Sequence, residues 1–269
     1  MLYYLQVIAL LGVARGRPFF ITPVPISIKT SAPLNRCGFH TLVFLSVFLY
    51  FYLFEYSNFH TFKNIQGDCM IITVASYKGG VGKTTTAVHL AAFLQTLAPT
   101  LLLDGDDTRN ATAWSQRGKG FSFKVADEVQ AARFARDFTH TVIDTGQRPK
   151  QVDLKVLSEG CDLLVVPAVP ASLDTDGLVL MLQALHDIGS DRYRVLLTKV
   201  PPPPEPEGPQ LRAGLIAQGV PLFTVDIPRL KAFEKAAAAG VPVSEVNDSR
   251  AKRAWDAYTA AGKELFTHV

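Results

Sequence analysis

Cysteine is scarce in this chain of 269 residues. The three cysteines, Cys37, Cys69 and Cys161, are odd in number and lack the spacing of metal-binding pairs. This argues against a disulfide framework or a zinc site and is typical of a protein from a reducing cytosol. The six histidines show no ligand pairs either. We therefore expect His89 to be an ordinary side chain on a helix.

A net basic charge is missing from most of the chain. The whole sequence has 27 Lys/Arg and 24 Asp/Glu, and the first 69 residues hold five and two of them, so 22 of each remain in residues 70–269. The formal charge of +3 therefore belongs to the first quarter alone. Bulk charge gives no argument for a nucleic-acid partner.

The first quarter also lacks the usual marks of a membrane span or a secretion signal. The apolar run at 41–54 would reach only about 21 Å as a helix, short of a hydrocarbon core of about 30 Å. Arg15 and Arg17 follow the first apolar stretch, whereas a signal peptide has its basic residues in front. We interpret residues 1–69 as a non-native or disordered hydrophobic leader, with translation starting at Met70. A genuine membrane anchor is the alternative.

From Met70 onward, short apolar runs alternate with helical patterns. Near-continuous apolar strands alternating with helices are typical of the α/β class, here a three-layer, mostly parallel twisted sheet with helices on both faces. The proline-rich stretch 200–209 is predicted to be a surface connection within this one domain, 70–269. The predicted strands are 71–76, 100–104, 121–125, 140–144, 162–168, 194–198 and 221–225, and the predicted helices are 84–97, 127–137, 149–159, 174–188, 209–218, 229–239 and 249–266.

The stretch "SYKGGVGKTTTA" at 76–87 follows the apolar run "IITVA" directly. A strand, a glycine-rich loop and a helix that opens with Lys-Thr form the context of a phosphate-binding loop. Glycines let the backbone turn tightly and aim successive N–H groups at phosphate, and the helix start adds its positive end. We expect Lys83 to reach the β- and γ-phosphates and Thr84 to bind Mg²⁺. The predicted nucleotide-binding residues of the loop are Gly79, Gly80, Val81, Gly82, Lys83, Thr84 and Thr85.

Acidic residues stand at the ends of two later predicted strands. Asp104 ends the run "LLLD", Asp106 follows two residues on, and Asp144 ends "TVID". The carboxyl ends of parallel strands form the ligand-binding edge of such a sheet. We assign Asp144 to the Mg²⁺ shell and Asp104 to metal contact and water positioning, and we interpret Asp106 as a switch residue that responds to the γ-phosphate.

The motifs "KGGVGKTT", "LLLDGDDTRNATAW", "TVIDT" and "CDLLVVPAVPASLDTDGL" together resemble the deviant Walker A ATPases of the ParA/MinD group. The resemblance covers residues 70–269 and is strongest to the small, ParF-like partition ATPases. It implies a P-loop NTPase fold with ATP and Mg²⁺ as cofactors, and slow ATP hydrolysis. It also implies that Lys78 is the signature lysine, which touches the phosphates of the partner in an ATP-bound homodimer. Lys78, Lys83 and Asp104 are thus the implied catalytic residues.

The chain departs from the family pattern in two places. Residues 104–108 read Asp-Gly-Asp-Asp-Thr, without the family's proline and glutamine, which puts the hydrolysis rate and the switch coupling in doubt. Thr198 stands where the family often has an adenine-reading asparagine. Base contacts are instead predicted from the backbone near 225–229, including Pro228 and Arg229.

The resemblance implies several partners besides a second copy of the chain. These are non-specific DNA, bound at the nucleoid in the cytoplasm, and a centromere-binding or adaptor protein that stimulates hydrolysis. The cargo stays open among plasmid, chromosome region and protein assembly. Two alternatives remain: a MinD-like ATPase that cycles onto membranes, and a nucleotide-dependent scaffold with negligible hydrolysis. The candidate DNA-binding residues are Arg229, Lys231, Lys235, Arg250, Lys252 and Arg253.

Overall fold

The computed structural model of the chain describes residues 69–134, 136–171 and 175–268. The predictions for residues 1–69 lie outside the described residues, except that Cys69 is exposed. Met70 is buried as the first residue of the first strand. No helix within the described ranges is long and apolar enough to cross a membrane.

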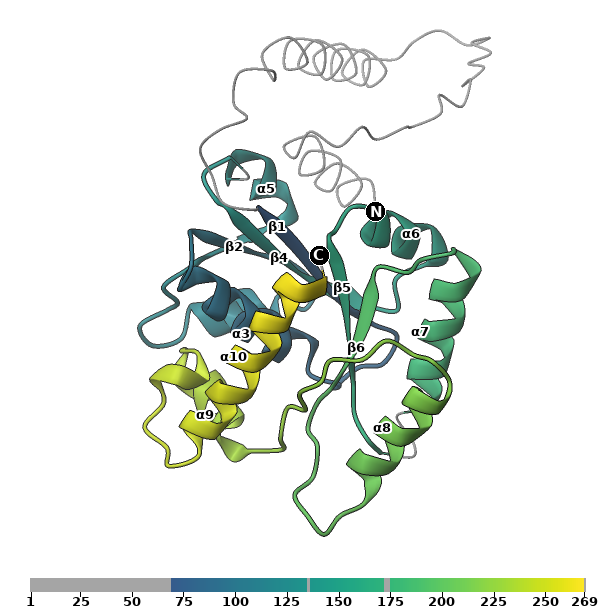
Figure 1. The fold of residues 1–269 in the computed structure, drawn as a ribbon. Coiled ribbons are helices and arrows are strands. Elements are labelled where there is room, and N and C mark those ends of the chain that lie inside the picture. The colour runs from purple at the N-terminus through teal and green to yellow at the C-terminus, as the bar shows by residue number, and fades with distance from the viewer. Residues whose placement is uncertain (1–68, 135, 172–174, 269) are drawn as a thin grey trace, which may run out of the picture.

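One parallel sheet forms the middle of the molecule (Figure 1). Its strand order is β3-β2-β4-β1-β5-β6, and every neighbouring pair runs parallel. All the carboxyl ends of the strands therefore meet at one edge, where ligands bind in sheets of this kind. The strands are β1 (Met70–Ser76), β2 (Thr100–Gly105), β3 (Lys124–Asp127), β4 (His140–Gln147), β5 (Leu163–Ala168) and β6 (Tyr193–Leu197).

Helices cover both faces of the sheet and make the predicted three layers. One face carries α3 (Lys83–Gln95), α4 (Asn110–Ser115), α9 (Lys231–Ala239), the short 3₁₀ helix η3 (Val243–Glu245) and α10 (Ala251–His268). The other carries α5 (Glu128–Phe134), α6 (Gln151–Glu159), α7 (Thr175–Asp187) and α8 (Glu207–Ala217). The fold class predicted from the sequence is confirmed.

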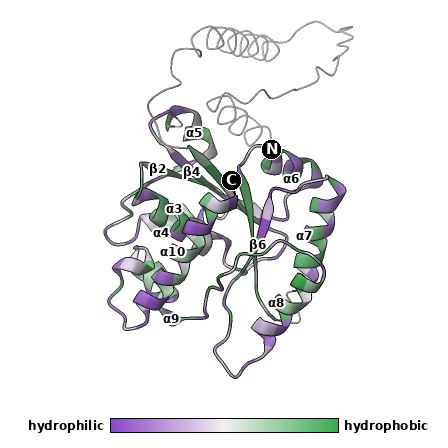
Figure 2. Cartoon of the chain, in the orientation of Figure 1, coloured by the Kyte–Doolittle hydropathy of each residue, from purple (hydrophilic) through white to green (hydrophobic). Residues whose placement is uncertain are grey.

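The strands are apolar along their whole length because both of their faces are covered. In β1, Ile72 and Val74 belong to the core beneath α3 and α10, while Ile71 and Ala75 belong to the core beneath α6 and α7. This follows from the alternation of side chains along a strand. Figure 2 shows the central strands mostly green, whereas the helices carry both green and purple residues.

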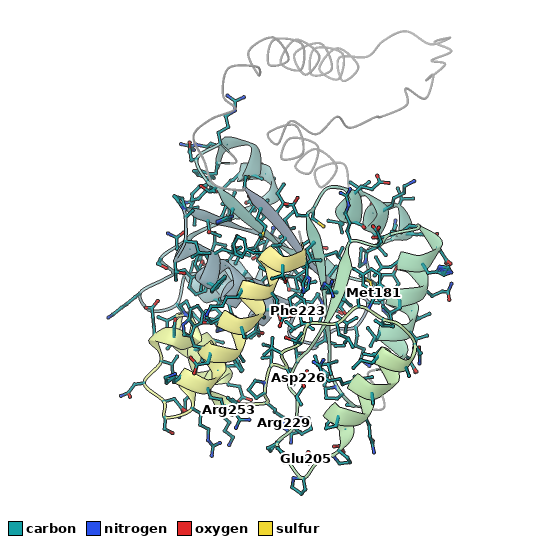
Figure 3. The ribbon with its side chains drawn as sticks, in the orientation of Figure 1. Met181, Glu205, Phe223, Asp226, Arg229 and Arg253 are labelled. Carbon is teal, nitrogen blue, oxygen red and sulfur yellow. The ribbon has the colours of Figure 1, made fainter. Side chains whose placement is uncertain are left out.

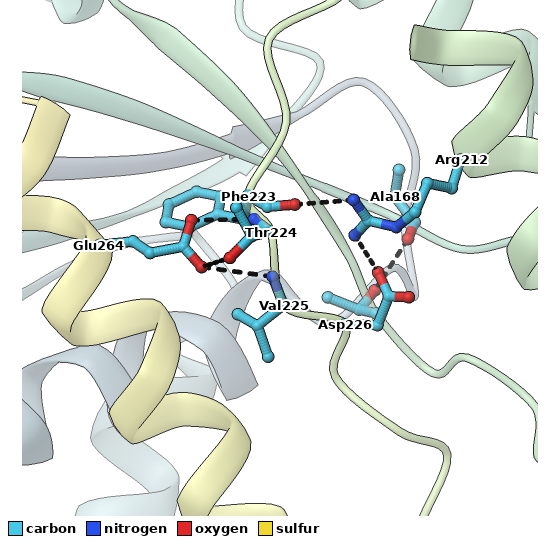
Figure 4. Close-up of polar contacts among 8 residues, drawn as sticks. Ala168, Arg212, Phe223, Thr224, Val225, Asp226 and Glu264 are labelled. Atoms are coloured by element: carbon cyan, nitrogen blue, oxygen red, sulfur yellow. Dashed lines mark hydrogen bonds and ion pairs between the residues drawn. The ribbon is translucent and has the colours of Figure 1, made fainter.

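The predicted strand at 221–225 is wrong. The segment follows β6 closely, with Val195 N–H donating to Pro221 O at 2.9 Å and Phe223 N–H to Val195 O at 3.0 Å, but these bonds make a single isolated bridge between Val195 and Leu222. Side chains hold it instead of a further ladder (Figure 4).

Two helices supply those side chains. Glu264 of α10 accepts from the backbone N–H groups of Thr224 and Val225 at 2.9 and 3.3 Å. Arg212 of α8 donates to Phe223 O at 3.0 Å and pairs with Asp226. The backbone groups that a neighbouring strand would satisfy are thus bound by side chains.

The predicted strand at 121–125 is displaced, because β3 starts only at Lys124. Phe121 and Phe123 stack on one another at 4.7 Å, and Phe121 meets the edge of Trp114. These rings join the core beside α4, a helix that the sequence pattern did not predict. Aromatic packing has taken the place of strand pairing here.

His89 lies on α3 as expected and is fully buried. One ring nitrogen, Nδ1, donates to Thr85 O at 2.6 Å, and Nε2 accepts from Val243 N–H at 3.0 Å. The ring stacks on Tyr258 of α10 at 4.7 Å. Burial lowers the pKa of His89 to about 4, and the bond to Thr85 opposes this only in part. The neutral imidazole thus joins α3 to η3 and α10.

Candidate nucleotide site

The phosphate loop lies between the end of β1 at Ser76 and the start of α3 at Lys83. Gly80 and Gly82 have φ angles of 76° and 88°, a region that side chains disfavour. A Cβ at Gly79 would stand 2.8 Å from the side-chain oxygen of Gln147. The backbone path therefore favours glycine at 80 and 82, as the motif predicts, while a side chain at 79 would require Gln147 to move.

Lys83 is almost entirely buried, with 6% of its surface exposed. Burial lowers the pKa of its amine, while Asp144 and Asp106 act in the opposite direction. Burying an ammonium group is unfavourable unless opposite charge compensates it. The loop thus holds a desolvated cation beside two carboxylates, an arrangement suited to a bound anion with its metal.

Asp144 and Thr84 form the candidate magnesium position. Asp144 is fully buried, and burial raises the pKa of its carboxyl to about 7, although a hydrogen bond from Thr84 lowers it. The charge of Asp104 raises the pKa of Asp144 further, and that of Lys83 lowers it. A carboxylate and a hydroxyl are oxygen donors of the type that Mg²⁺ prefers. The carboxylates of Asp104 and Asp106 act on the same buried position, so the setting fits the predicted cation.

Asp104 lies directly beside Asp144, since the two are Cα partners across the β2–β4 ladder. Its Oδ2 accepts from the N–H and the hydroxyl of Thr112, both at 2.7 Å. Its Oδ1 faces Asp106 N at 3.4 Å. The carboxylate therefore holds the first turn of α4 in place, in addition to the metal and water role predicted for it.

Asp106 closes the loop that follows β2. Its Oδ1 accepts from the N–H and the hydroxyl of Thr108 at 3.0 and 2.8 Å, and its carbonyl accepts from Arg109 N–H at 2.9 Å. Arg109 has a φ of 51°, and its guanidinium donates to Asp104 O. In place of the missing proline, the loop is held by hydrogen bonds of its own side chains.

Lys78 is half-buried at the start of the phosphate loop, two residues after the end of β1. Its N–H donates to Ser76 Oγ at 3.2 Å. A Cβ on Gly177 of α7 would stand 2.8 Å from the Cβ of Lys78, so α7 begins tightly against this lysine. The two lysines of the motif thus belong to one loop but have different surroundings.

Two residues after β6 contact the loop from the other side. Thr198 Oγ1 donates to Val81 O at 2.7 Å, and Lys199 Nζ donates to Gly80 O at 2.6 Å. The sequence drew attention to Thr198 but not to Lys199, and it missed Gln147 and Thr112 as well. Gln147 and Lys199 could have been predicted as site residues, because Gln147 ends β4 and Lys199 follows the end of β6.

The predicted base-contact segment lies beside the end of β6. Ile227 O accepts from Val200 N–H at 3.0 Å, and Arg229 N–H donates to Val200 O at 2.8 Å. Pro228 bridges to Val200. Arg229 also forms an ion pair with Glu205 at 3.0 Å, so this arginine already has an acidic partner.

The candidate DNA-binding residues are all exposed, but several are paired with acids. Lys235 pairs with Asp248 at 2.5 Å and Lys252 with Asp256 at 2.7 Å. Lys235 first, and Arg250 in addition, lower the pKa of Asp248. Within the described part of the chain, no ion pair joins Lys231 or Arg253 to an acid. Arg229, Glu205 and Arg253 lie toward the same end of the molecule (Figure 3).

The match to a family model decides the assignment. Residues 72–243 match the model described as "CobQ/CobB/MinD/ParA nucleotide binding domain". The chain belongs to this family. Among curated relatives of this ParA/MinD chain is the maintenance of carboxysome distribution protein A of Gloeobacter kilaueensis, 32% identical over 204 residues that cover 72% of this chain and 93% of the relative. Protein ParA of Rhizobium radiobacter is 28% identical and covers 57% of this chain and 75% of its own length.

Solved structures of ParA/MinD-type ATPases share the fold. The ATP complex of a Cyanothece McdA variant superposes with a TM-score of 0.60 at 16% identity and covers 76% of this chain and 98% of its own. The MinD cell division protein of Aquifex aeolicus gives a TM-score of 0.57 at 14% identity, covering 74% and 98%. At such identities the likeness establishes the architecture alone.

Proposed function

We propose that this protein is a magnesium-dependent ATPase that positions a cellular cargo by alternating between a monomer and an ATP-bound dimer. The observation that carries the proposal is the pair of lysines on one phosphate loop. Lys83 is buried against carboxylates, whereas Lys78 stands half-buried against Gly177, at the rim of the same site. The first would serve the chain's own nucleotide, and the second would contact the nucleotide of a partner.

The dimer follows from electrostatics. Two triphosphates brought face to face concentrate negative charge in a partly desolvated place, and a lysine donated across the interface offsets it. Loss of the γ-phosphate weakens that interaction and releases the partner. Nucleotide state would thereby control association.

The test measures the molar mass in solution by light scattering, with Mg²⁺ and either ATP or a slowly hydrolysed ATP analogue. We expect the wild type to dimerise, and Lys78→Ala and Lys78→Gln to stay monomeric while still binding ATP. Lys155→Ala is the matched control, because Lys155 lies exposed on α6 and pairs with Glu159 at 3.8 Å. Dimerisation of both Lys78 variants would refute the role of this lysine.

The remaining residues of the site divide the chemistry among them. Thr84 and Asp144 would hold Mg²⁺, which would supply positive charge to the triphosphate and polarise it. Lys83 would neutralise the β- and γ-phosphates. Asp104 would orient the attacking water, and Asp106 would sense the γ-phosphate through the loop at 104–108.

Hydrolysis separates this proposal from the scaffold alternative. We expect slow, steady release of phosphate from ATP, accelerated by DNA together with an adaptor protein. A rate that stays at the buffer background, with ATP bound and dimers formed, would favour a nucleotide-dependent scaffold.

We propose that the dimer binds DNA without sequence preference. Support comes from exposed basic residues on α9 and α10, among which Lys231 and Arg253 carry no neutralising acid in the described structure. Dimerisation would double the charge presented to DNA, and binding should fall steeply with salt. Retention on DNA that is independent of ATP, or absent at low salt, would contradict the proposal.

The cargo that we propose is a large protein assembly. Two curated relatives, from Gloeobacter kilaueensis and Halothiobacillus neapolitanus, are named for maintaining carboxysome distribution. Other relatives are named ParA and chromosome-partitioning ATPase Soj, which keeps DNA as the alternative cargo. Deleting the gene should disturb the even spacing of the assembly and leave plasmid retention unchanged; the reverse result would favour DNA.

Membrane cycling is the rival function, and the packing of α10 bears on it. A membrane-binding tail needs an apolar helix face free to enter lipid. In α10, Tyr258, Gly262 and Leu265 are buried, the first bonded to Thr86 and the second packed against Phe93. Sedimentation of the protein with anionic liposomes in ATP tests the rival, and we expect none.

A further inference from the structure

We propose that Lys199 is a positioning residue that presets the phosphate loop for its ligand. The inference rests on the proposed nucleotide site and deepens it. Lys199 Nζ lies 2.6 Å from Gly80 O, so the amine bonds to the backbone of the loop from a segment 119 residues away in the chain. It is a third lysine at this loop, distinct from Lys78 and Lys83.

The backbone around Lys199 is held on both sides. Thr198 N–H donates to Ala168 O at 2.7 Å, and Val200 N–H donates to Ile227 O at 3.0 Å. Between these anchors Lys199 has a φ of 51°, in the left-handed region that non-glycine residues rarely occupy. Such a conformation persists where the surroundings determine it. The turn is built so that the side chain at 199 faces the loop.

Lys199 and its neighbour bind two consecutive carbonyls of the loop. Thr198 Oγ1 donates to Val81 O at 2.7 Å, beside the bond from Lys199 to Gly80 O. In a trans peptide the carbonyl of one residue and the N–H of the next point in opposite directions. Fixing the carbonyls of Gly80 and Val81 therefore fixes the N–H groups of Val81 and Gly82, which turn away from Thr198 and Lys199.

Those N–H groups are the donors that a phosphate loop presents to its ligand. Gly80 and Gly82 both have positive φ, and no neighbouring atom stands within 4 Å of a Cβ built on Gly80. Lys199 thus holds the carbonyl of a glycine that has open space on its Cβ side, next to the buried side chain of Val81. Without the amine of Lys199, we expect the peptide at Gly80 to sample other orientations and the loop to lose part of its readiness for phosphate.

The role makes a prediction that separates Lys199 from the other two lysines. Preorganisation of the loop acts on every ligand with a phosphate chain, whatever its base and whether or not a partner is present. We therefore expect Lys199→Met, which keeps the stem and removes the charge, to weaken the binding of both ADP and inorganic tripolyphosphate about fivefold, the net effect of one ordinary hydrogen bond, because the amine acts through the loop and lies exposed to water. Isothermal titration calorimetry with each ligand measures this.

Three variants control for structure. Lys199→Arg retains a donor and should restore most of the affinity. Lys199→Gly removes the amine and relieves the positive φ, but it also raises the entropy of the unfolded chain, so its melting temperature without nucleotide should stay close to that of the wild type while its affinity falls as in Lys199→Met. If Lys199 served only the stability of the fold, the melting temperature and the ligand affinity would change in the same direction. Lys155→Met should change neither.

The outcomes are separable. If the wild type binds ADP and Lys199→Met binds both ligands as tightly, the positioning role is wrong and the proposed function stands. If only ADP weakens, Lys199 contacts the base and the preset loop is refuted. If the wild type binds neither ligand, the proposed function itself fails.

Discussion

Charged side chains occupy two regions of this molecule under opposite conditions. At the carboxyl edge of the sheet, Lys83, Asp104 and Asp144 are buried: the β2–β4 ladder sets the two aspartates side by side, and the loop after β1 brings Lys83 to them. On α9 and α10, basic residues such as Lys235 and Lys252 lie exposed, each beside an acid. Burying charge is unfavourable, so buried charges persist where a ligand or a hydrogen-bond network requires them. An exposed charge is solvated by water, so its presence does not by itself indicate a ligand.

The largest effect should come from the buried edge. Lys83→Ala removes the cation expected to meet the β- and γ-phosphates, and we expect ATP affinity to fall by at least about 100-fold, the equivalent of one or two charge-assisted hydrogen bonds. The fold should remain, because the substitution also removes a desolvated amine. Calorimetry measures the affinity, and circular dichroism the fold. Unchanged affinity would show that the buried charge has another purpose.

His89 extends the comparison to a buried group that stays neutral. Its pKa is about 4 in the folded protein against an ordinary value of 6.5, so the unfolded chain takes up the proton first as pH falls. Its contribution to stability is complete above about pH 6.5 and is lost as pH falls toward 4, with a total of about 3 kcal/mol.

The measurement is the free energy of unfolding in urea at pH 7 and pH 4.5. His89→Gln does not titrate, so its unfolding free energy should fall less over this interval than that of the wild type. The other titratable ring in contact is Tyr258, whose raised pKa keeps it neutral throughout. Equal losses in both proteins would exclude His89 as the source.

The two buried aspartates of this edge, Asp104 and Asp144, are expected to have different roles. Asp104→Ala leaves the N–H and hydroxyl of Thr112 without their acceptor, and we expect a loss of about 1–3 kcal/mol in stability. Asp144→Ala should change stability less, because burial already disfavours its charged form, but should remove the Mg²⁺ dependence of ATP binding. Thermal unfolding and titrations with and without Mg²⁺ separate the two effects, and a reversed order would exchange the two assignments.

The smallest effects belong to the exposed region. Lys235→Ala with Lys252→Ala should change stability by less than about 1 kcal/mol, as is usual for surface ion pairs. Lys231→Ala with Arg253→Ala should instead lower the salt dependence of DNA binding, with a log–log slope reduced by about 1 to 2. Filter binding across a salt series compares the two pairs of substitutions. Equal slopes for both would show that acid pairing does not decide which charges meet DNA.

Local patterns were enough to predict much of this molecule. The run "IITVAS" followed by "YKGGVGKTT" predicted a strand, a tight turn and a helix start in order, because a continuous apolar run, glycines and a Lys-Thr pair act over a few residues. For the same reason Asp104 and Asp144 were assigned to strand ends; the structure pairs them across β2 and β4, although β4 continues beyond Asp144 to Gln147. The three-layer class followed from strands that are apolar on both faces.

Tertiary structure decided what depends on distant neighbours. The segment at 221–225 has the composition of a strand, yet Glu264 and Arg212 bind its polar groups from two helices. Thr112 became the partner of Asp104, and Lys199 of Gly80, across 8 and 119 positions in the chain. The sequence determines which groups need a partner, through burial and hydrogen bonding. Which partner they find depends on how the packed layers bring together side chains that are far apart in the chain. A pattern of a few neighbouring residues holds no information on such contacts.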